Sequence, residues 1–323
     1  MKRMEGVLQA ADRFQQRHGV LGFPVAVIKK FGDDQAGKHA VLLAYYGLFS
    51  LFPLLLVFVT VLAYALANNP ELQRQLISTV IAHFPGFGPQ LQASIKTIQG
   101  SGIGLVVGVL GTLWGGLGIT QSAQDAMNAV WNIPRKDRPT WGLRLARSLG
   151  SLLLLAVAVF AATALAQLGV TGRGVLGRLP LGGSLLLNLL VLAALCQILT
   201  ATRQPWRQLL PGAVVGALGW SVLQALGAYI VSRQLERANL VYGAFAIVIV
   251  LLSWLYLSAQ MLLYAAEVNV VLVRRLWPRS LLQSPLTGPD QQVLVALAET
   301  EERLPQETIE VRFSSEVNGE ETH

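Results

Sequence analysis

The chain alternates long apolar segments with short polar connections. Six segments reach the length of roughly 20 mostly apolar residues that a bilayer-spanning helix requires. They cover residues 40–67, 102–131, 149–168, 183–202, 209–231 and 242–273. Backbone polar groups inside lipid must be hydrogen-bonded within the protein, and these segments are too long and continuous for the strands of a barrel. The pattern therefore predicts an all-α membrane protein with six transmembrane helices.

The composition supports this interpretation. Of the 323 residues, 53% are hydrophobic and only 13% are charged, whereas a soluble domain carries about 25% charged residues. Cys196 is the single cysteine, so an intrachain disulfide is excluded.

Lysine and arginine predict the orientation of the six helices. The segments that would share a side with both termini contain 17 of these residues up to Arg279, and the opposite connections contain 6. Basic residues concentrate on the cytoplasmic side, so both termini are predicted to be cytoplasmic. The net charge of +7 then indicates topology and attraction for anionic lipid, and we expect no nucleic-acid partner.

The regions outside the six segments differ in character. Residues 1–38 are amphipathic, interrupted at Pro24, and either lie on the inner leaflet or pack on the helical bundle. Residues 39–279 form the transmembrane domain, in which 68–101 is predicted to be an outer helical hairpin. Residues 280–323 are acidic, and we expect a cytoplasmic tail that contains one amphipathic helix and is partly disordered. A solvated tail is favoured over a specific partner site.

Glycine rows in the second and fifth spans predict close helix packing. Gly111, Gly115 and Gly118 lie three or four residues apart, as do Gly212, Gly216 and Gly219. Pro53, in the first span, removes one backbone hydrogen bond.

A polar stripe runs along the sixth span. Ala246, Ser253, Gln260, Glu267 and Arg274 are spaced by seven residues, and seven residues are nearly two helical turns. A charged side chain in lipid costs about 2.5–3.5 kcal/mol, so this face is expected to point into the bundle. The second span has a matching polar group near its cytoplasmic end. The candidate polar cavity is therefore Ser253, Gln260, Glu267, Asn269, Gln121, Asp125 and Asn128.

Two interpretations of the carboxylates Asp125 and Glu267 stay open. They can be salt-bridged residues that lock helix ends, or they can line the inner mouth of a cavity for a charged amphiphile or a proton. The candidate basic partners at that mouth are Arg138, Arg144, Arg147, Arg203 and Arg274.

Motifs for familiar chemistry are missing from the sequence. The four histidines do not have metal-ligand spacing, and the sequence lacks Cys-x-x-Cys, a Walker loop and a Gly-x-Ser-x-Gly elbow. We therefore predict no catalytic residue, no metal, no cofactor and no ATP-driven activity.

Several segments resemble the YihY/BrkB family of bacterial inner-membrane proteins. They are "LLAYYGLFSLFPLLL" (42–56), "DAMNAVWNIP" (125–134), "PGAVVGALGW" (211–220) and "NLVYGAFAIVIVLLSWLYLSAQMLLYAAEVN" (239–269). The resemblance implies six helices, both termini in the cytoplasm and an inner-membrane location. Beside Asp125, Glu267 and Asn269, it marks as structural positions Tyr45, Ser50, Pro53, Pro211, Gly212, Tyr242, Gly243, Trp254 and Tyr256.

The same resemblance bears on function. The family once carried the label ribonuclease BN, for which this sequence shows no chemistry, and members have been linked with movement of lipid precursors. The leading hypothesis is a transporter or flippase-like protein for an anionic lipid or other amphiphile. The alternatives are an envelope scaffold or regulator and, least favoured, a ribonuclease. Membrane lipids are the expected partners, while a homo-oligomer and an envelope protein partner stay open.

Overall fold

The described part of the chain is helical. The computed structural model describes residues 12–16, 19–65, 102–171, 179–242, 244–281 and 286–313. Within these ranges there are helices and irregular connections and no β-strand, which confirms the all-α prediction. The predicted outer hairpin at 68–101 and Gly243 lie outside the described residues.

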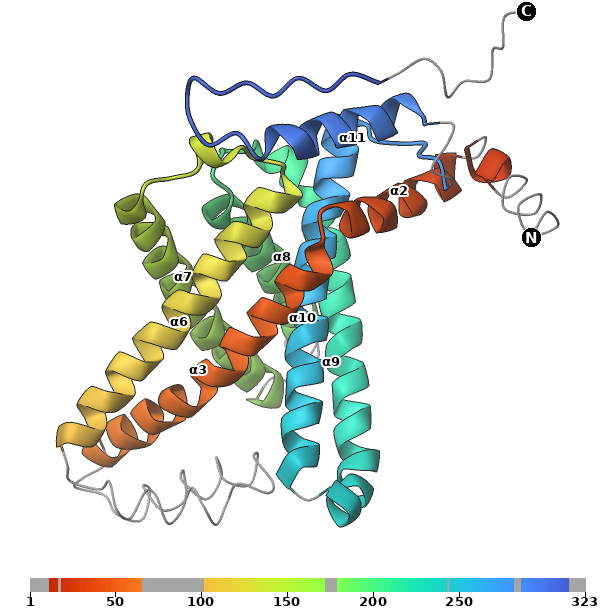
Figure 1. Ribbon diagram of the computed structural model, residues 1–323. Coiled ribbons are helices and arrows are strands. Elements are labelled where there is room, and N and C mark those ends of the chain that lie inside the picture. The colour runs from red at the N-terminus through yellow and green to blue at the C-terminus, as the bar shows by residue number, and fades with distance from the viewer. Residues whose placement is uncertain are drawn as a thin grey trace, which may run out of the picture. The chain divides into compact units, whose positions relative to one another are not determined.

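Among the described residues, each predicted span coincides for most of its length with one long helix (Figure 1). The elements are α2 (Gly19–Asp33), α3 (Ala36–Ala65), α6 (Gly102–Val130), the short 3-10 helix η1 (Arg135–Asp137), α7 (Trp141–Thr171), α8 (Leu179–Leu199), α9 (Trp206–Tyr242), α10 (Ala244–Arg274) and α11 (Gly288–Glu299). Within the described residues, four helices contain stretches long and apolar enough to cross a membrane. These stretches are Trp141–Ala162, Gly182–Leu199, Trp206–Leu226 and Val248–Arg274.

The chain divides into two compact units. The first contains Met1–Ala40, Ala123–Ser221 and Gln260–His323, and the second contains Val41–Ser122 and Val222–Ala259.

In the second unit, the glycine row of α6 packs against α3. A Cβ atom at Gly111 would lie 3.0 Å from Pro53, one at Gly115 would lie 2.8 Å from Ser50, and one at Gly118 would lie 2.6 Å from the ring of Tyr46. The helices thus approach more closely than side chains at these positions would permit, as the glycine spacing predicts.

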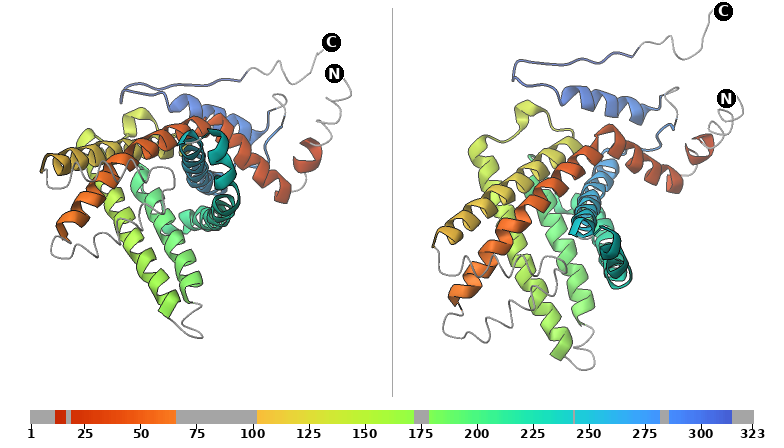
Figure 2. Two further views of the ribbon diagram at one scale, coloured as in Figure 1. Left: turned by 90° about the horizontal axis from the view of Figure 1, so that it is seen from below. Right: turned by 60° about the horizontal axis from the view of Figure 1, so that its bottom comes forward.

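In the first unit, α7 and α8 run side by side (Figures 1 and 2). The first part of α9 packs against the last part of α10 with almost no space at Gly212. A Cβ atom there would collide with the carbonyl oxygen of Ala265 and would lie 2.5 Å from Nδ2 of Asn269. Asn269 also binds the α9 backbone, because its Oδ1 accepts a hydrogen bond from Gly212 N at 2.7 Å. The polar side chain and the missing Cβ together set this helix contact.

Helices α6 and α10 end in the same way. Beyond α6, Asn132 has φ 46° and its N–H donates to Ala129 O, while Ile133 N donates to Asn128 O. Beyond α10, Arg275 has φ 54°, and Leu276 N donates to Val271 O. Both are Schellman motifs, which satisfy the last carbonyl groups of a helix. Asparagine tolerates the left-handed conformation well, whereas arginine there is unusual.

Helix α2 packs against the first unit through one face. Phe31 stacks on Tyr264 with ring centroids 4.1 Å apart, Phe23 meets Trp277 edge-on, and Lys30 is fully buried. These contacts favour the interpretation in which α2 packs on the helical bundle over the one in which it lies on the inner leaflet. The expected break at Pro24 is wrong, because α2 continues through it. Pro24 is the sixth residue of α2, so the missing N–H removes one hydrogen bond close to the helix start.

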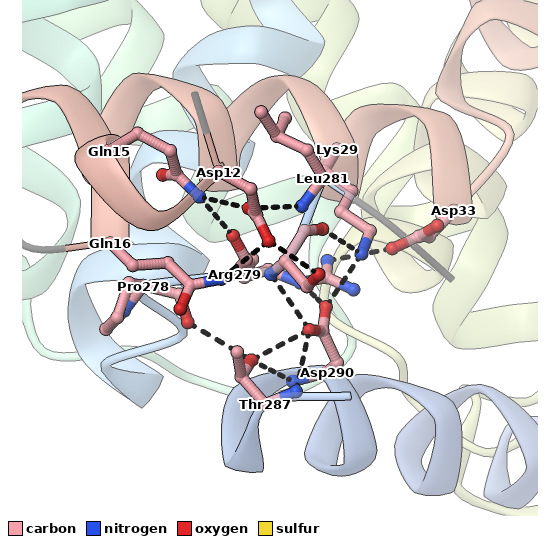
Figure 3. A network of polar contacts seen from close by, with 11 residues as sticks. Asp12, Gln15, Gln16, Lys29, Asp33, Pro278, Arg279, Leu281, Thr287 and Asp290 are labelled. Atoms are coloured by element: carbon pink, nitrogen blue, oxygen red, sulfur yellow. Dashed lines mark hydrogen bonds and ion pairs between the residues drawn. The ribbon is translucent and has the colours of Figure 1, made fainter. Parts of the chain in front are cut away.

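The tail helix α11 is tied to the first unit by a buried polar network (Figure 3). Thr287 caps α11 in a capping box with Asp290. Asp290 accepts hydrogen bonds from Lys29 Nζ at 2.9 Å, Arg279 Nε at 2.8 Å and Ser280 N at 3.0 Å. Beside it, Asp12 accepts from Ser280 Oγ and from the backbone N–H of Leu281. The network joins Asp12, near the start of the described chain, to the first turn of α11 and the segment before it.

The segment after α11 lies against the connection between α6 and α7. Arg135 N donates to Thr300 O at 3.3 Å, and Lys136 N donates to Glu302 O at 3.0 Å. The side chains of Lys136 and Glu302 form an ion pair at 2.7 Å. We predicted one helix and a solvated tail; the structure shows the helix, and it also shows these contacts for residues beyond it.

Substitution of Gly212 by alanine tests the contact between α9 and α10. The added Cβ would displace the Ala265 carbonyl or Asn269, and overpacking of this kind costs about 1–3 kcal/mol. We expect Gly212→Ala to lower the midpoint of thermal unfolding of the detergent-solubilised protein. Gly150→Ala is the control, because nothing lies within 4 Å of a Cβ atom there; equal midpoints for the two variants would contradict the close approach.

The Asp290 network predicts how the docking of α11 depends on pH. Burial alone would raise the pKa of Asp290, but hydrogen bonds from Lys29, Ser280 N and Thr287 lower it well below its ordinary value. A lowered pKa stabilises the docked state above the ordinary pKa of about 4, and this stability is lost only as the pH falls toward the lowered value.

Hydrogen exchange of the α11 amides, corrected for intrinsic rates, measures this docking. We expect equal protection of α11 at pH 7 and pH 5 in the natural protein and weaker protection at both values in Asp290→Asn. Gln292→Ala, on the exposed side of α11, should leave protection unchanged. Loss of protection between pH 7 and pH 5 in the natural protein would show that Asp290 does not hold the helix as described.

Candidate functional site

The candidate site is built around Glu267 in the last third of α10. Its side chain is fully buried. The nearest cation is the ammonium of Lys30, whose Nζ lies 3.6 Å from Glu267 Oε2. Within the described residues neither carboxylate oxygen has a hydrogen-bond partner. Glu267 is therefore a buried acid that is paired electrostatically but has no donor on either oxygen.

Lys30 reaches this position from α2 and serves several acceptors. It forms an ion pair and a hydrogen bond with Asp34, one turn further along α2. It also donates to Val130 O at 2.9 Å, at the end of α6. All three charged side chains, those of Lys30, Asp34 and Glu267, are fully buried. One ammonium is therefore shared by two carboxylates and a helix terminus.

Asn132 and Arg274 extend the cluster. Asn132 Nδ2 donates to Asp34 Oδ1 at 3.0 Å, and Asn132 Oδ1 accepts from Arg274 Nη1 at 3.5 Å. Arg274 Nη2 also donates to Trp131 O at 2.6 Å. Two cations thus meet the carbonyl end of α6, where the helix dipole is negative. The cluster of Lys30, Asp34, Asn132, Glu267 and Arg274, called the Glu267 cluster below, contains two cations and two carboxylates.

The partner of Glu267 corrects the sequence-based expectation. The candidate cations were five arginines, and the structure places a lysine from the N-terminal region there instead. In the sequence, Lys30 contributes only as one of the basic residues that predict the orientation. A local signal did exist: Val27, Lys30, Phe31 and Asp34 share one helical face, and a lysine between two apolar residues with an acid at i+4 is a candidate for burial as a pair.

Asp125 belongs to a different set of charges. It pairs with Arg144 and lies 4.0 Å from Arg138, and its side chain is partly exposed. The ion pairs of Asp125 are with Arg144 and Arg138, whereas that of Glu267 is with Lys30. Asp125 fits the salt-bridge interpretation, since it links the end of α6 to the start of α7.

Other predicted polar residues form hydrogen bonds with backbone groups just beyond helix ends. Asn128 Oδ1 accepts from Ala201 N at 2.9 Å, and Arg147 donates to Thr200 O and Ala201 O at 2.9 and 3.1 Å. Arg147 thus satisfies carbonyl groups just beyond α8. Sequence reasoning missed Gln124, which is buried and donates to Ser148 Oγ at 2.9 Å.

The remaining candidates are distributed over both units. Ser253 is exposed and Gln121 is half-buried in the second unit, while Gln260 is half-buried in the first and Arg203 is exposed. The polar stripe of α10 is therefore buried at Glu267 and exposed at Ser253 and Arg274. Which of these positions line a common cavity stays a prediction.

The family-motif positions are mainly packing residues. Ser50 Oγ donates to Gly47 O at 2.9 Å, and the ring of Tyr45 lies 4.6 Å from that of Phe49. Pro53 packs near Gly111. Pro211 is exposed, Trp254 and Tyr256 are half-buried, and Tyr242 ends α9.

The described residues contain no group of three or more histidine, cysteine, aspartate or glutamate side chains that could hold a metal ion. The Glu267 cluster offers the chemistry of its two carboxylates and two cations. A buried carboxylate without a donor can accept a proton, and a shared ammonium can shift its interaction between two acids.

Comparison with known proteins gives a consistent result. The chain matches the family described as "Virulence factor BrkB" over residues 27–284. The ribonuclease-like protein YfkH of Bacillus subtilis (strain 168) is 29% identical over 281 residues, which cover 79% of this chain and 96% of that protein. The inner membrane protein YhjD of Escherichia coli (strain K12) is 21% identical over 81% of this chain and 84% of its own length.

Some relatives are longer. A UPF0761 membrane protein of Alkalilimnicola ehrlichii is 28% identical over 256 residues, which cover 76% of this chain but only 57% of that protein. The chain therefore spans little more than half the length of this relative. No solved structure matches the chain.

Removal of the Lys30 ammonium tests the Glu267 cluster. Lys30→Met would leave two buried carboxylates without their shared cation, and removal of one partner from a buried pair costs about 3–5 kcal/mol. We expect a large drop in the thermal midpoint, measured in detergent. The drop should be smaller in Lys30→Met combined with Glu267→Gln, because one uncompensated charge is then gone.

Lys38→Met is the matched control. Lys38 is exposed and bonds only to Gln35 among the described residues, so its loss should change the midpoint little. If Lys30→Met and Lys38→Met have the same midpoint, Lys30 does not hold the cluster together.

Proposed function

The chain belongs to the BrkB family of membrane proteins, and on this premise we propose that it transports an anionic lipid or another anionic amphiphile across the bacterial inner membrane. Transport by this protein alone is not ATP-driven, since the sequence contains no nucleotide-binding motif. The energy then comes from an ion gradient or a partner protein. The path runs along α6, α9 and α10.

The proposal includes six membrane crossings with both termini in the cytoplasm. Four crossings rest on helix length and composition. The other two rest on the coincidence of α3 and α6 with predicted spans, and the orientation rests on the bias of lysine and arginine. The name of the E. coli relative, an inner membrane protein, supports the location.

Buried Glu267 is the observation that carries the proposal. Ionisable residues within membrane helices are costly, and they commonly mark substrate or proton pathways. Glu267 has no hydrogen-bond donor among the described residues and shares Lys30 with Asp34. When Glu267 binds a proton, it loses its charge, and Lys30 then forms an ion pair with Asp34 alone. Protonation thus changes the attraction between α10 and α2, which gives a proton gradient a way to act on helix packing.

An envelope scaffold or regulator is the second candidate. Its support is the number of polar side chains that fix helix ends, including Asn128, Arg147 and Arg274. A scaffold needs such rigid junctions and no proton exchange at Glu267. The two candidates therefore differ in whether Glu267 must be ionisable.

A ribonuclease is the least supported candidate. It rests on the name of the B. subtilis relative. RNA hydrolysis by the purified protein that requires Asp125 or Glu267 would favour it over transport.

Reconstitution into liposomes tests transport. We expect the natural protein to accelerate the movement of fluorescent phosphatidylglycerol between leaflets, measured by dithionite quenching, and Glu267→Gln to slow it at least tenfold. The reason is that glutamine keeps the shape of the side chain but cannot exchange a proton. Equal rates in vesicles with and without the protein would sink the transport hypothesis.

Glu299→Gln is the matched control, because Glu299 is an exposed carboxylate on α11 and its loss should leave the rate unchanged. If Glu267→Gln also keeps the full rate, transport stands but the role of Glu267 is wrong. In the same study, a cysteine at Glu310 should react with a membrane-impermeant thiol reagent in inside-out vesicles and not in right-side-out vesicles.

A further inference from the structure

We propose that the connection between α6 and α7 is a binding surface for the phosphate groups of anionic lipids, and that residues 300–310 of this chain occupy it as a competing ligand. The connection, residues 131–140, is called the basic loop, and residues 300–310 are called the acidic strap. The inference rests on the proposed function, because it identifies where the anionic substrate first meets the protein and what covers that place.

The two segments are complementary in charge. The basic loop has three basic residues and one acidic residue, and the acidic strap has four glutamates and one arginine. Lys136 Nζ lies 2.7 Å from a carboxylate oxygen of Glu302, and Arg135 Nη2 lies 3.3 Å from one of Glu301. The ammonium of Lys136 holds the pKa of the Glu302 carboxyl below its ordinary value, so Glu302 is charged at neutral pH.

The backbone of the loop also takes part. Arg135 N and Lys136 N donate to the carbonyl oxygens of Thr300 and Glu302, and Lys136 Nζ reaches Glu307 O at 3.4 Å. The loop therefore presents two N–H groups and two cationic side chains in one direction. Oxygen atoms of a phosphate group suit the same donors, since arginine, lysine and backbone N–H groups bind carboxylate and phosphate alike.

The basic loop lies where a lipid headgroup would be found. Trp141 directly follows it as the first residue of α7, and 75% of its surface is exposed. The stretch from Trp141 onward is apolar enough to cross the membrane. Tryptophan is enriched at the level of the headgroups, so the loop is placed at the polar edge of the bilayer, where basic residues attract anionic lipid.

The contact between strap and loop can open. The side chains of Arg135 and Glu301 are 48% and 56% exposed, while those of Lys136 and Glu302 are 24% and 8% exposed. Exposed ion pairs are individually weak, so a dense anionic surface can displace the strap. By contrast, α11 before the strap is anchored by buried Asp290. The strap thus stays close to the loop after release.

Native mass spectrometry of the full-length protein in detergent tests the proposal. The probes are short-chain phosphatidylglycerol, phosphatidylcholine and inorganic phosphate. We expect the double variant Glu301→Gln, Glu302→Gln to bind phosphatidylglycerol more tightly than the natural protein by about fivefold for each freed cation, the effect of one basic residue at an anionic surface. Phosphatidylcholine binding should not change.

The control is Glu299→Gln combined with Glu316→Gln, which makes the same change in net charge at two carboxylates outside the acidic strap. Glu299 has no contact with the basic loop among the described residues. Adding Lys136→Gln to the first double variant should remove most of the gain. Equal phosphatidylglycerol affinity in the two double variants, or a gain that survives Lys136→Gln, would overturn the proposal. An equal gain for inorganic phosphate would show a site for free phosphate and overturn the lipid assignment.

Hydrogen exchange gives a test that requires no substitution. Addition of phosphatidylglycerol to the natural protein should raise deuterium uptake in the strap and leave α11 protected; unchanged uptake in the strap would count against displacement. Neither measurement depends on transport. A gain in binding without lipid movement in liposomes would refute the proposed transport and leave the strap standing, and the reverse result would refute only the strap.

Discussion

One buried ammonium holds the first unit of this protein together. Lys30 contacts Asp34 on its own helix, Glu267 on α10 and the carbonyl oxygen of Val130 at the end of α6. None of these acceptors is exposed to water, so each requires a compensating donor or charge, and Lys30 contributes to all of them. The N-terminal helix α2 is therefore a structural part of the helical unit. These contacts explain why Lys30 is buried in the first unit although few residues of this protein are charged.

The wider pattern is that cations meet helix ends. Lys30 and Arg274 bind the end of α6, and Arg147 binds the chain just beyond α8. Helix termini carry unsatisfied carbonyl groups and a partial negative charge, and near a bilayer these groups have few alternatives. Some of the basic residues from which the orientation is predicted thus also stabilise helix ends. Small residues complement it, since Gly212 lets α9 and α10 approach closely enough for Asn269 to bind backbone.

The polar contacts of the first unit that involve the C-terminal region include strongly held ones and weaker ones. Asp290 and Arg279 are buried and bonded on several sides, while the ion pairs of the acidic strap are partly exposed. Burial makes the first contact insensitive to salt, and exposure makes the second sensitive to it.

The sequence by itself determined the helices and their approximate bounds, because an apolar run of membrane length has few stable structures other than a helix. It also determined the close packing at glycine rows and singled out Glu267, since a carboxylate beside a long apolar run demands compensation. Only the tertiary structure decided which cation provides it. Lys30 is 237 residues away in the chain from Glu267, and no local pattern links the two. The same holds for Asp290 and Lys29 and for the strap on the basic loop: ion pairs between distant segments depend on how helices pack, and several arginines and lysines were equally plausible partners until that packing was known.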